Sequence, residues 1–425
     1  MILVAPAVLG VPLRGGRRLI ADPALPPYVA LSRSHASARA TALGADDASW
    51  SEFTADQPRF NGAARRLLLE GARTNAIRNP RAEGAVAGTP GTLPTYWGLT
   101  GLPSGITSTV IGVVTVNGVQ CLRLRLAGTP AASGTGRLEP EGLNTIAAAN
   151  GQSWTSSVFV GLSAGSLANL TLSHRVMGRD GSYAAYNMVN AALSPGASLG
   201  RSMVTTTLAS ASVVTATTDI TLGFSASQAV DCTLHVGWPQ MEQAPYASTP
   251  VLPLAGSLGG STRGADLLGG SLASLGLGAN AACTLLLWGV LPQGAGAAAD
   301  QLLLSLDDGT SSNRYRLFNP AGSGTLQIGR SLAGSLAAVS AGSITPGAAF
   351  KVGIAIDAAG RATASLNGAA VVAQTGGPTT GLTTLRIGND AAGTSACFGQ
   401  VAECRLLPFA APDAVLPGLV TALPG

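Results

Sequence analysis

Short runs rich in Val, Ile, Thr and Leu recur along most of the chain, and clusters of Gly, Asn, Ser and Pro separate them. Runs of this length and spacing predict the strands of β-sandwiches. They fall into two sets: 106–116, 120–126, 153–160, 167–176, 203–207, 219–224 and 232–238, then 283–291, 301–306, 314–318, 325–328, 350–356, 362–366, 385–387 and 400–406. We therefore predict an all-β chain with two β-sandwich domains in tandem.

Turn dipeptides that tolerate positive φ angles separate several of these runs. They are Asn117-Gly118, Asp180-Gly181, Asp308-Gly309 and Asn367-Gly368. Such pairs close hairpins between neighbouring strands. The segment 362–373, with Asn367-Gly368 at its centre, predicts the clearest hairpin of the chain.

The composition excludes several other classes of protein. The chain has 56 glycines and 25 prolines in 425 residues, and these are the two poorest helix formers. Only 11% of its residues are charged and 46% are hydrophobic, which is the reverse of a disordered chain. The glycines show no three-residue period, so the chain is not collagen-like.

Four regions follow from the spacing of the predicted strands. Residues 1–78 show no self-sufficient core, and we expect them to attach the chain to a particle and to pack on the next domain or on a partner. Residues 79–249 and 271–425 are the two predicted sandwiches. Residues 250–270 are rich in Pro and Gly with little periodicity, which predicts a linker.

The charge pattern does not favour nucleic-acid or membrane partners. The net charge is +4, but Lys351 is the single lysine and the arginines are scattered, with no basic stripe interleaved with aromatic residues. The N-terminal apolar run precedes its charges, the reverse of a secretory signal, so we expect none. Glycines interrupt the uncharged stretches 84–122 and 267–299, which predicts strands and loops rather than a membrane helix.

Five cysteines are widely spaced and form no CxxC pair: Cys121, Cys232, Cys283, Cys397 and Cys404. Cys397 and Cys404 are close enough in sequence to pair across one hairpin. The alternative, which we favour, is five buried thiols that act as small hydrophobic residues.

The most specific segment is LLLEGARTNAIRNPR at 67–81, which resembles the LLIE-x-x-RTN-L-x-x-N motif of phage tail-fibre and spike proteins. Two segments that precede this motif in the family are similar to LSRSHASARAT at 31–41 and to PRF at 58–60. The family's next domain ends on a segment similar to PQMEQAPYASTPVLP at 239–253, and TRGAD follows at 262–266. Ala244 and Ser248 depart from that pattern.

The last third of the chain resembles the concanavalin-A-like (laminin-G-like) sandwich that often follows in these proteins. The matching pieces are LLSLDDGTSSNRYRL at 303–317, ATASLNGAAVV at 362–372, LRIGND at 385–390 and FGQVAECRLLPFAAPDAVL at 398–416. The resemblance covers about residues 28–420. It implies a carbohydrate-binding-module-like jelly-roll, a C-terminal lectin-like domain and a homotrimer.

The motif residues are best interpreted as structural. Glu70 lies three residues before Arg73, and a strand-end carboxylate with an arginine partner would hold a domain junction. Asn75 is typical of residues that bond to the backbone in turns. We expect Gln240 and Glu242 to act similarly at the far edge of the jelly-roll.

The sequence shows no constellation typical of an enzyme. The chain has three histidines, at 35, 174 and 235: His235 lies in an apolar strand pattern typical of a core, and His174 lies at a strand end beside Arg175. Glu139 and Glu141 could share a face as a glycosidase pair, but the Pro and Gly around them predict a loop. We therefore predict no catalysis and no cofactor.

A weak calcium-site hypothesis concerns the predicted turn after residue 306. Asp307, Asp308 and Asn313 supply oxygen atoms of the kind that Ca²⁺ prefers. The alternative, an acidic hairpin turn, is favoured, and we predict no metal site.

Sugar binding requires flat aromatic side chains next to polar groups. Tyr96 and Trp97 lie in a Pro- and Gly-rich stretch, where we expect exposed rings. The segment 175–187 is the most polar and aromatic part of the chain, and an ordinary polar hairpin is the alternative there. Its candidate glycan contacts are Arg175, Arg179, Asp180, Tyr183, Tyr186 and Asn187.

The resemblance implies a fibre or spike of a tailed phage or phage-like particle, and the lack of a catalytic constellation predicts that it is non-enzymatic. Its N-terminal region would bind other particle proteins (baseplate, tail or capsid), and its sandwiches would bind host surface polysaccharide. It would assemble in the host cytoplasm and lie on the particle surface. The alternatives are a capsule-polysaccharide depolymerase on the same kind of particle and a purely structural connector.

Overall fold

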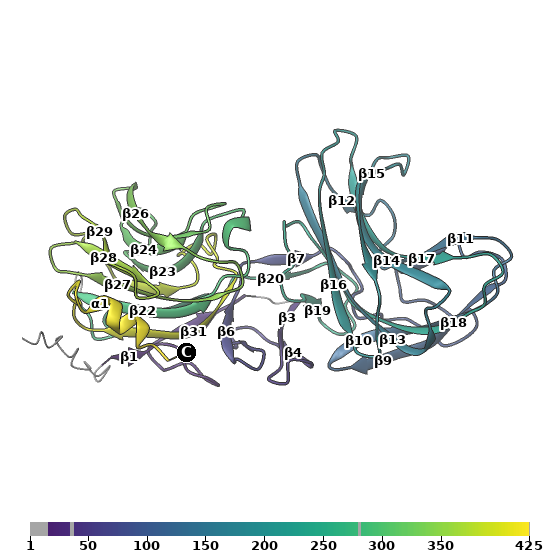
Figure 1. Cartoon of the computed structure of the whole chain (residues 1–425), viewed down its shortest axis with the longest axis horizontal. Helices are drawn as coiled ribbons and strands as arrows, with labels where there is room; N and C mark the ends of the chain where they lie inside the picture. The colour runs from purple at the N-terminus through teal and green to yellow at the C-terminus, as the bar shows by residue number, and fades with distance from the viewer. Residues whose placement is uncertain (1–15, 35–37, 279–281, 425) are drawn as a thin grey trace, which may run out of the picture. The chain divides into compact units, whose positions relative to one another are not determined.

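The computed structural model describes residues 16–34, 38–278 and 282–424, and its regular secondary structure consists almost wholly of β-strands joined by loops (Figure 1). The prediction of an all-β chain with β-sandwich domains is confirmed. The chain divides into two compact units, each assembled from separate segments. Unit 1 comprises Met1–Arg33, Asp56–Ala72 and Ala265–Gly425, and unit 2 comprises Ser34–Ala55 and Arg73–Gly264.

The body of unit 2 is a sandwich of two antiparallel sheets. The five-stranded sheet has the order β16 (Gly200–Thr207), β13 (Ser153–Ser166), β18 (Val230–Glu242), β10 (Val119–Gly128) and β9 (Ile106–Val116). The six-stranded sheet has the order β15 (Ala185–Leu193), β14 (Leu170–Arg179), β17 (Thr215–Phe224), β11 (Gly134–Glu139) and β8 (Gly98–Thr100), with β12 (Ile146–Ala147) also paired to β17.

Alternation along the strands builds the core between these two sheets. Successive side chains of a strand point to opposite faces, so every second residue can be apolar and buried. In β10, Leu122, Leu124 and Leu126 are fully buried, whereas Arg123 and Arg125 point to the other face. The same core contains Leu172, Ile220, Leu222, Leu234 and Val236.

Two smaller sheets complete unit 2. One has the order β19 (Leu252–Pro253), β3 (Ala38–Leu43) and β4 (Trp50–Phe53), and the other pairs β20 (Ser261–Arg263) with β7 (Arg73–Asn75). A separate apolar cluster joins the first of them to the five-stranded sheet. It contains Val119, Cys121, Phe159, Trp238 and Leu252, with Trp50 packed against it.

Unit 1 is a second sandwich of two larger antiparallel sheets. The eight-stranded sheet has the order β29 (Val372–Gln374), β28 (Ala362–Leu366), β27 (Ala349–Ile356), β22 (Cys283–Val290), β31 (Gly399–Leu407), β6 (Arg66–Leu69) and β5 (Phe60–Asn61), and β1 (Arg17–Arg18) pairs with β31. The seven-stranded sheet has the order β2 (Ala30–Ser32), β21 (Leu267–Ser271), β30 (Thr384–Ile387), β23 (Gln301–Asp307), β24 (Arg314–Asn319), β25 (Thr325–Leu332) and β26 (Ser335–Ser343).

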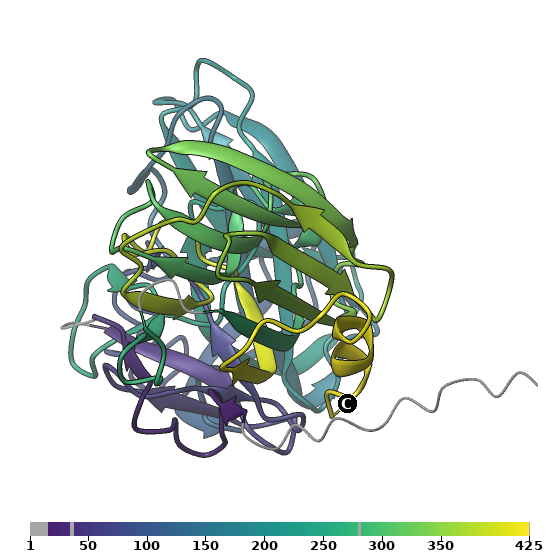
Figure 2. The same cartoon turned by 90° about the vertical axis from the view of Figure 1, so that its left-hand side faces the viewer.

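The main core of unit 1 lies between these sheets, and a short helix covers the outside of one of them. Leu285, Leu304, Leu317, Ile328 and Ile354 belong to the core. Helix α1 (Leu416–Thr421, yellow in Figure 2) buries Leu416, Leu419 and Val420 against residues of β22, β27 and β31. The described residues contain one further helical turn, η1 (Gly294–Gly296).

The predicted turn dipeptides close hairpins. Asn117 and Gly118 have φ angles of 49° and 80° between the paired residues Val116 and Val119. A side chain at Gly118 would lie 2.0 Å from the backbone oxygen of Trp50, so glycine is required there by both space and φ. Asn367 and Gly368 adopt the same conformation between β28 and β29, which confirms the hairpin predicted there.

The N-terminal region and the predicted linker take part in the sheets. Within residues 1–78, strands β1, β2, β5 and β6 belong to unit 1, whereas β3, β4 and β7 belong to unit 2. Residues 250–270 contain β19, β20 and most of β21. Backbone pairing with distant strands stabilises these segments, and local periodicity does not reveal such pairing. The predicted attachment role of residues 1–78 stays a prediction.

No helix within the described ranges is both long and apolar enough to span a membrane.

Candidate functional site

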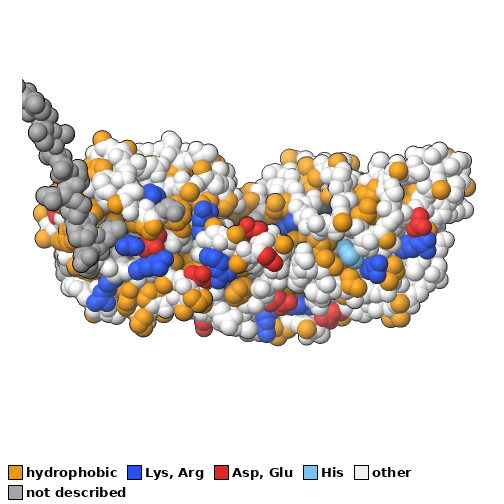
Figure 3. Space-filling model, turned by 60° about the horizontal axis from the view of Figure 1, so that its bottom comes forward, with side chains coloured by type: hydrophobic (Ala, Val, Ile, Leu, Met, Phe, Trp, Pro, Cys, Tyr) orange, Lys and Arg blue, Asp and Glu red, His pale blue; other side chains and the backbone are white. Residues whose placement is uncertain are grey.

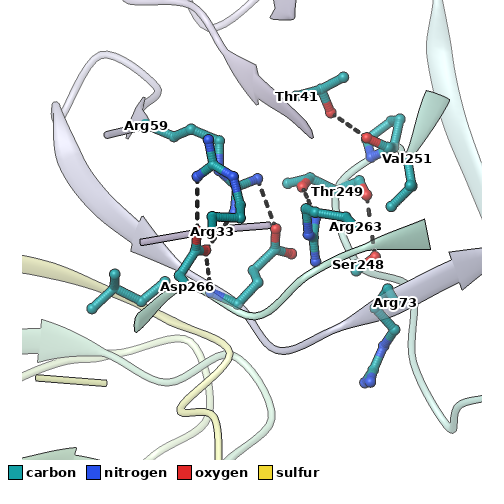
Figure 4. A network of polar contacts seen from close by, with 12 residues as sticks. Arg33, Thr41, Arg59, Arg73, Ser248, Thr249, Val251, Arg263 and Asp266 are labelled. Carbon is teal, nitrogen blue, oxygen red and sulfur yellow. Dashed lines mark hydrogen bonds and ion pairs between the residues drawn. The ribbon is translucent and has the colours of Figure 1, made fainter. Parts of the chain in front are cut away.

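Residues from four segments of the tail-fibre resemblance meet in a buried network in unit 1 (Figure 4). Each carboxylate oxygen of Asp266 accepts one hydrogen bond from an arginine. Arg33 Nη1 donates to Oδ1 and Arg59 Nη2 donates to Oδ2, each over 2.7 Å. Arg59 Nη1 also donates to Glu70 Oε2 at 2.9 Å. The side chains of Arg33, Arg59 and Asp266 have no exposed surface, so the two arginines and two carboxylates neutralise one another. The arginine partner predicted for Glu70 is thus supplied by Arg59 of the PRF segment.

The remaining motif residues form a second buried cluster, in unit 2. Asn75 Nδ2 donates to the backbone oxygens of Pro239 and Val251, and its Oδ1 accepts from the Ile77 and Met241 amides. Gln240 donates to Glu242, which also accepts from Ser248 Oγ and forms an ion pair with Arg73 at 3.5 Å. Burial raises the pKa of the Glu242 carboxyl. These contacts favour the structural interpretation of these residues.

The outer face of the six-stranded sheet in unit 2 carries a row of charged side chains. Arg175 on β14 lies opposite Asp219 on β17, and its Nε and Nη2 donate to the two carboxylate oxygens at 2.8 and 2.7 Å. Arg137 on β11 lies opposite Thr221 in the same sheet. Glu139 ends β11 two residues later, so it points to the same face and lies beside Asp219.

Glu139 is the most unusual member of this row. Its side chain is 6% exposed, and its Oε1 has no hydrogen-bond partner among the described residues. Burial raises the pKa of the Glu139 carboxyl, and the neighbouring charge of Asp219 raises it further. A side chain at Gly98 on β8 would lie 3.4 Å from Glu139 Oε2, which shows how closely the edge strand approaches this carboxylate.

The predicted segment 175–187 folds as a β14–β15 hairpin at the end of this row. Arg179 Nε donates to Thr217 Oγ1 at 3.0 Å, and its Nη1 donates to the backbone oxygen of Tyr183 at 2.7 Å. Asp180 Oδ1 accepts from the Ala184 amide, and its Oδ2 accepts from Tyr186 Oη at 3.1 Å. These bonds fix the turn and leave the Tyr183 ring 54% exposed next to the charged row.

The other predicted contacts differ in exposure. Tyr96 is 39% exposed, and the guanidinium of Arg78 lies 3.6 Å above its ring while donating to Glu141. Trp97 is buried in the core and donates through Nε1 to the Asn79 backbone oxygen, so the prediction that it is an exposed platform is wrong. Asn187 bonds to the Ala209 amide, a structural contact.

The structure therefore gathers Arg175, Arg179, Asp180 and Tyr183 at one end of the sheet, with Tyr96 just before its edge strand β8. The sequence reasoning missed Arg137 and Asp219, and it placed Glu139 in a loop although it ends a strand. A signal was present: along 170–179, the apolar Leu170, Leu172 and Val176 alternate with the polar Thr171, Ser173 and Arg175, the pattern of a strand with one polar face. Two oppositely charged groups, a carboxylate with a free oxygen and an exposed ring can bind the hydroxyl groups and the ring face of a sugar.

The structure corrects the prediction for His235 and buries His174 within strand β14. His174 is 1% exposed, and its Nε2 lies 2.8 Å from Ser156 Oγ while its Nδ1 lies 3.0 Å from Ser202 Oγ. Burial lowers the pKa of His174 to about 4. His235 points to the outer face of the five-stranded sheet and is half-buried, so it is not a core residue. His35 lies outside the described residues.

The candidate calcium residues form a hydrogen-bonded turn. Asp307 accepts from Ser305 Oγ and pairs with Arg386 at 3.0 Å. Asp308 accepts from the Thr310 amide and from Asn313 Nδ2, so the Asn313 amide presents a donor to the carboxylate. Within the described ranges, no three His, Cys, Asp or Glu residues are grouped to hold a metal ion.

The cysteines are free and buried, which confirms the interpretation as five unpaired thiols. Burial raises the pKa of Cys121, Cys283 and Cys397 to about 12, and that of Cys232 to about 11.

On the surface drawn in Figure 3, arginines are scattered and several lie beside acidic side chains. Arg125 and Asp231 form an exposed ion pair at 2.8 Å.

No protein-family model matches the chain, and no curated protein matches its sequence. Distant matches among solved structures include carbohydrate-binding β-sandwich modules. The CBM40 module of a Ruminococcus gnavus IT-sialidase, solved with α2,3-sialyllactose, is 13% identical with a TM-score of 0.28 over 33% of this chain and 83% of that chain. The CBM22-1 xylan-binding domain of Paenibacillus barcinonensis Xyn10C is 19% identical with a TM-score of 0.26 over 41% and 94%.

A partial match concerns a phage protein. The enzymatically active domain of tailspike protein 4 of bacteriophage CBA120 is 8% identical with a TM-score of 0.25, over 35% of this chain and 19% of that chain. At these identities the likeness concerns the β-sandwich fold alone.

Proposed function

We propose that the chain is a non-catalytic fibre or spike protein of a tailed phage or phage-like particle, and that it attaches the particle to a host surface glycan. The particle assignment rests on the order of the segments 31–41, 58–60, 67–81, 239–253 and 262–266 in the sequence. The trimer, the surface location and the contacts with other particle proteins follow from the same resemblance.

The observation that carries glycan binding is the charged outer face of the six-stranded sheet in unit 2. Arg175 and Asp219 hold each other through two hydrogen bonds, so their positions are fixed before a ligand arrives. Glu139 Oε1 offers an acceptor that is buried and unused within the described chain. Tyr183 adds an exposed ring at the end of the row. Several such weak sites on one oligomer would strengthen attachment through avidity.

One observation favours a second candidate function, the cleavage of a capsule polysaccharide. Glu139 has a raised pKa and lies beside Asp219, which Arg175 holds in an ion pair. Two neighbouring carboxyl groups with different environments are the arrangement that glycosidases use as acid and base. Against this role, both Asp219 oxygens already accept hydrogen bonds, Oδ1 from Thr221 as well as Arg175.

Light-scattering chromatography of purified bacterial capsular polysaccharide, run with and without the full-length protein, tests both functions. We expect a heavier co-eluting species and an unchanged polysaccharide mass. A fall in that mass, abolished by Glu139→Gln, would establish cleavage instead. No change in either quantity with any host polysaccharide would leave the structural connector as the better assignment.

Tyr183→Ala tests whether binding occurs on the proposed face. Arg179 bonds to the backbone oxygen of Tyr183, so the substitution keeps that contact, and we expect weaker co-elution at an unchanged Tm. Phe409→Ala is the matched control, because Phe409 in unit 1 is also a well-exposed aromatic residue (44% against 54%). Equal losses for both variants would place the glycan elsewhere.

A further inference from the structure

The outer face of the seven-stranded sheet in unit 1 carries a second set of polar side chains. Leu306, Tyr315 and Leu385 point into the core, so their neighbours along the strands point outward. The strand register places these outward residues in two adjacent rows across the sheet: Thr384, Asp307, Arg314 and Ser331, and then Gly269, Arg386, Ser305, Arg316 and Gly329.

Among the described residues, Arg314 forms no ion pair, whereas its neighbours Arg316 and Arg386 each form one. The Arg314 side chain is 8% exposed, and its Nε has no hydrogen-bond partner within the described residues. Asp307 lies directly opposite it in the register but pairs with Arg386 at 3.0 Å. Arg316, the next arginine on β24, pairs with Asp300 at 3.2 Å. A buried guanidinium without a partner is costly, so this position calls for a ligand that compensates the charge.

Besides its ion pair with Asp300, the guanidinium of Arg316 also contacts an aromatic ring. It lies 3.7 Å above the ring of Phe318, which is buried. A side chain at Gly329 would lie 3.0 Å from Leu336 and 3.1 Å from Phe318, so both residues close over this strand. Arg314 is therefore the arginine of β24 that is left to meet a ligand.

A groove of about 330 Å³ adjoins this row. Gly269, which belongs to the outward row, lines this groove, and a side chain there would lie 2.5 Å from the backbone oxygen of Leu385. The walls of the groove carry the polar groups of Ser32, Thr384, Arg386, Asn389 and Asp390. Thr384 also belongs to the row of Arg314, two strands away, which is about 10 Å at the usual spacing between strands.

We propose that this groove and Arg314 form a binding site for a carboxylate-bearing oligosaccharide, such as one built of uronic acids. The planar guanidinium of Arg314 matches a carboxylate through two parallel hydrogen bonds. The hydroxyl groups of Ser32 and Thr384 suit the hydroxyl groups of neighbouring sugar rings, and the missing side chain at Gly269 leaves room for those rings. Asp390 directs its carboxylate toward Thr394 and Ser395, which donate to it at 2.8 and 3.0 Å.

This site is separate from the one on the six-stranded sheet and does not depend on it. The test uses the full-length protein and affinity electrophoresis in gels that contain oligogalacturonate, its methyl ester or polyglutamate. The ester keeps the sugar and removes the charge, whereas polyglutamate keeps the charge and removes the sugar. We expect retardation by oligogalacturonate alone, and at least a tenfold weaker retardation of Arg314→Gln. Tyr183→Ala should be retarded as strongly as the unaltered protein.

Arg361→Gln is the matched control, because Arg361 is an exposed arginine of the same unit that pairs with Asp413 at 2.6 Å. It should leave retardation by oligogalacturonate unchanged. The Tm of Arg314→Gln separates a binding role from a structural one: removal of an uncompensated charge should keep or raise the Tm. A lowered Tm, equal retardation by the ester or by polyglutamate, or no retardation by oligogalacturonate would each overturn the proposal.

Discussion

Arg59 and Asp266 form an ion pair at 2.7 Å in which neither side chain has any exposed surface, although 207 residues separate them in the sequence. Asp266 also accepts a hydrogen bond from Arg33, and Arg59 also donates one to Glu70, so each charge is neutralised inside unit 1. A buried pair is stable only while both partners remain, because a single buried charge cannot be solvated.

The first prediction concerns this network. Asp266→Asn leaves Arg33 and Arg59 without their shared carboxylate, and we expect the free energy of unfolding to fall by about 3–5 kcal/mol. Asp413→Asn is the control, because its pair with Arg361 is exposed, and it should cost about 1 kcal/mol or less. Urea unfolding at pH 7 measures both. Similar small losses for the two variants would show that the network adds little to stability.

The second prediction concerns pH. The pKa of His174 falls from 6.5 to about 4 on folding, because burial disfavours the charged ring. The folded state therefore binds this proton less readily than the unfolded state. Its stabilisation is fully present above pH 6.5 and is lost progressively between pH 6.5 and pH 4, by about 3 kcal/mol in total.

His174→Gln should remove that part of the pH dependence, as measured by urea unfolding at several pH values between 4 and 7.5. The half-buried His235, whose pKa is also lowered by burial and by Arg123, provides the comparison. His235→Gln should change the slope less than His174→Gln. An unchanged slope in the His174 variant would contradict the assigned cause.

The third prediction concerns the thiols. Burial raises the pKa of Cys121, Cys283 and Cys397 to about 12, so almost no thiolate forms at pH 8. We expect iodoacetamide to leave all five cysteines unmodified in the native protein and to modify five in guanidinium chloride, as counted by intact mass. Modification of a single cysteine in the native state would reveal local opening around it.

Local patterns in the sequence predicted the strands and turns. They did not predict which segments distant in the sequence contact one another. Asn117-Gly118 specifies its turn through the φ angles that these two residues tolerate, and no distant partner is needed. Glu70 is different: Arg73 is its nearest arginine in the sequence, but the ion pair forms with Arg59 through strand pairing between β5 and β6.

In the candidate site, too, the sequence did not reveal contacts between residues that are distant along the chain. The segment 175–187 contains Arg175, but Asp219, which completes the pair, is 44 residues away on β17. Trp97 looked exposed because Pro and Gly surround it, yet its ring fills the core and its indole N–H bonds to Asn79. Loop composition predicts the backbone of such a segment and not the direction of its side chains.

The fourth prediction concerns the unpartnered oxygen of Glu139. Its pKa is raised by burial and by Asp219, so the folded state binds the proton more tightly than the unfolded state. The stabilising contribution of this group is present at low pH and is lost as the pH rises through its folded pKa. Above that pKa the ionised carboxylate is destabilising, and Glu139→Gln should raise the free energy of unfolding there.

The advantage of Glu139→Gln should shrink as the pH falls through the folded pKa of Glu139, because the carboxyl of the original protein then takes up its proton. Glu141→Gln is the matched control two residues away, because Glu141 accepts hydrogen bonds from the Arg78 amide and guanidinium. It should lower stability at pH 7 and at pH 4. Urea unfolding of the original protein and of both variants at pH 7 and pH 4 measures these changes in stability. A loss of stability in Glu139→Gln at pH 7 would mean that the arginines around this carboxylate compensate its charge.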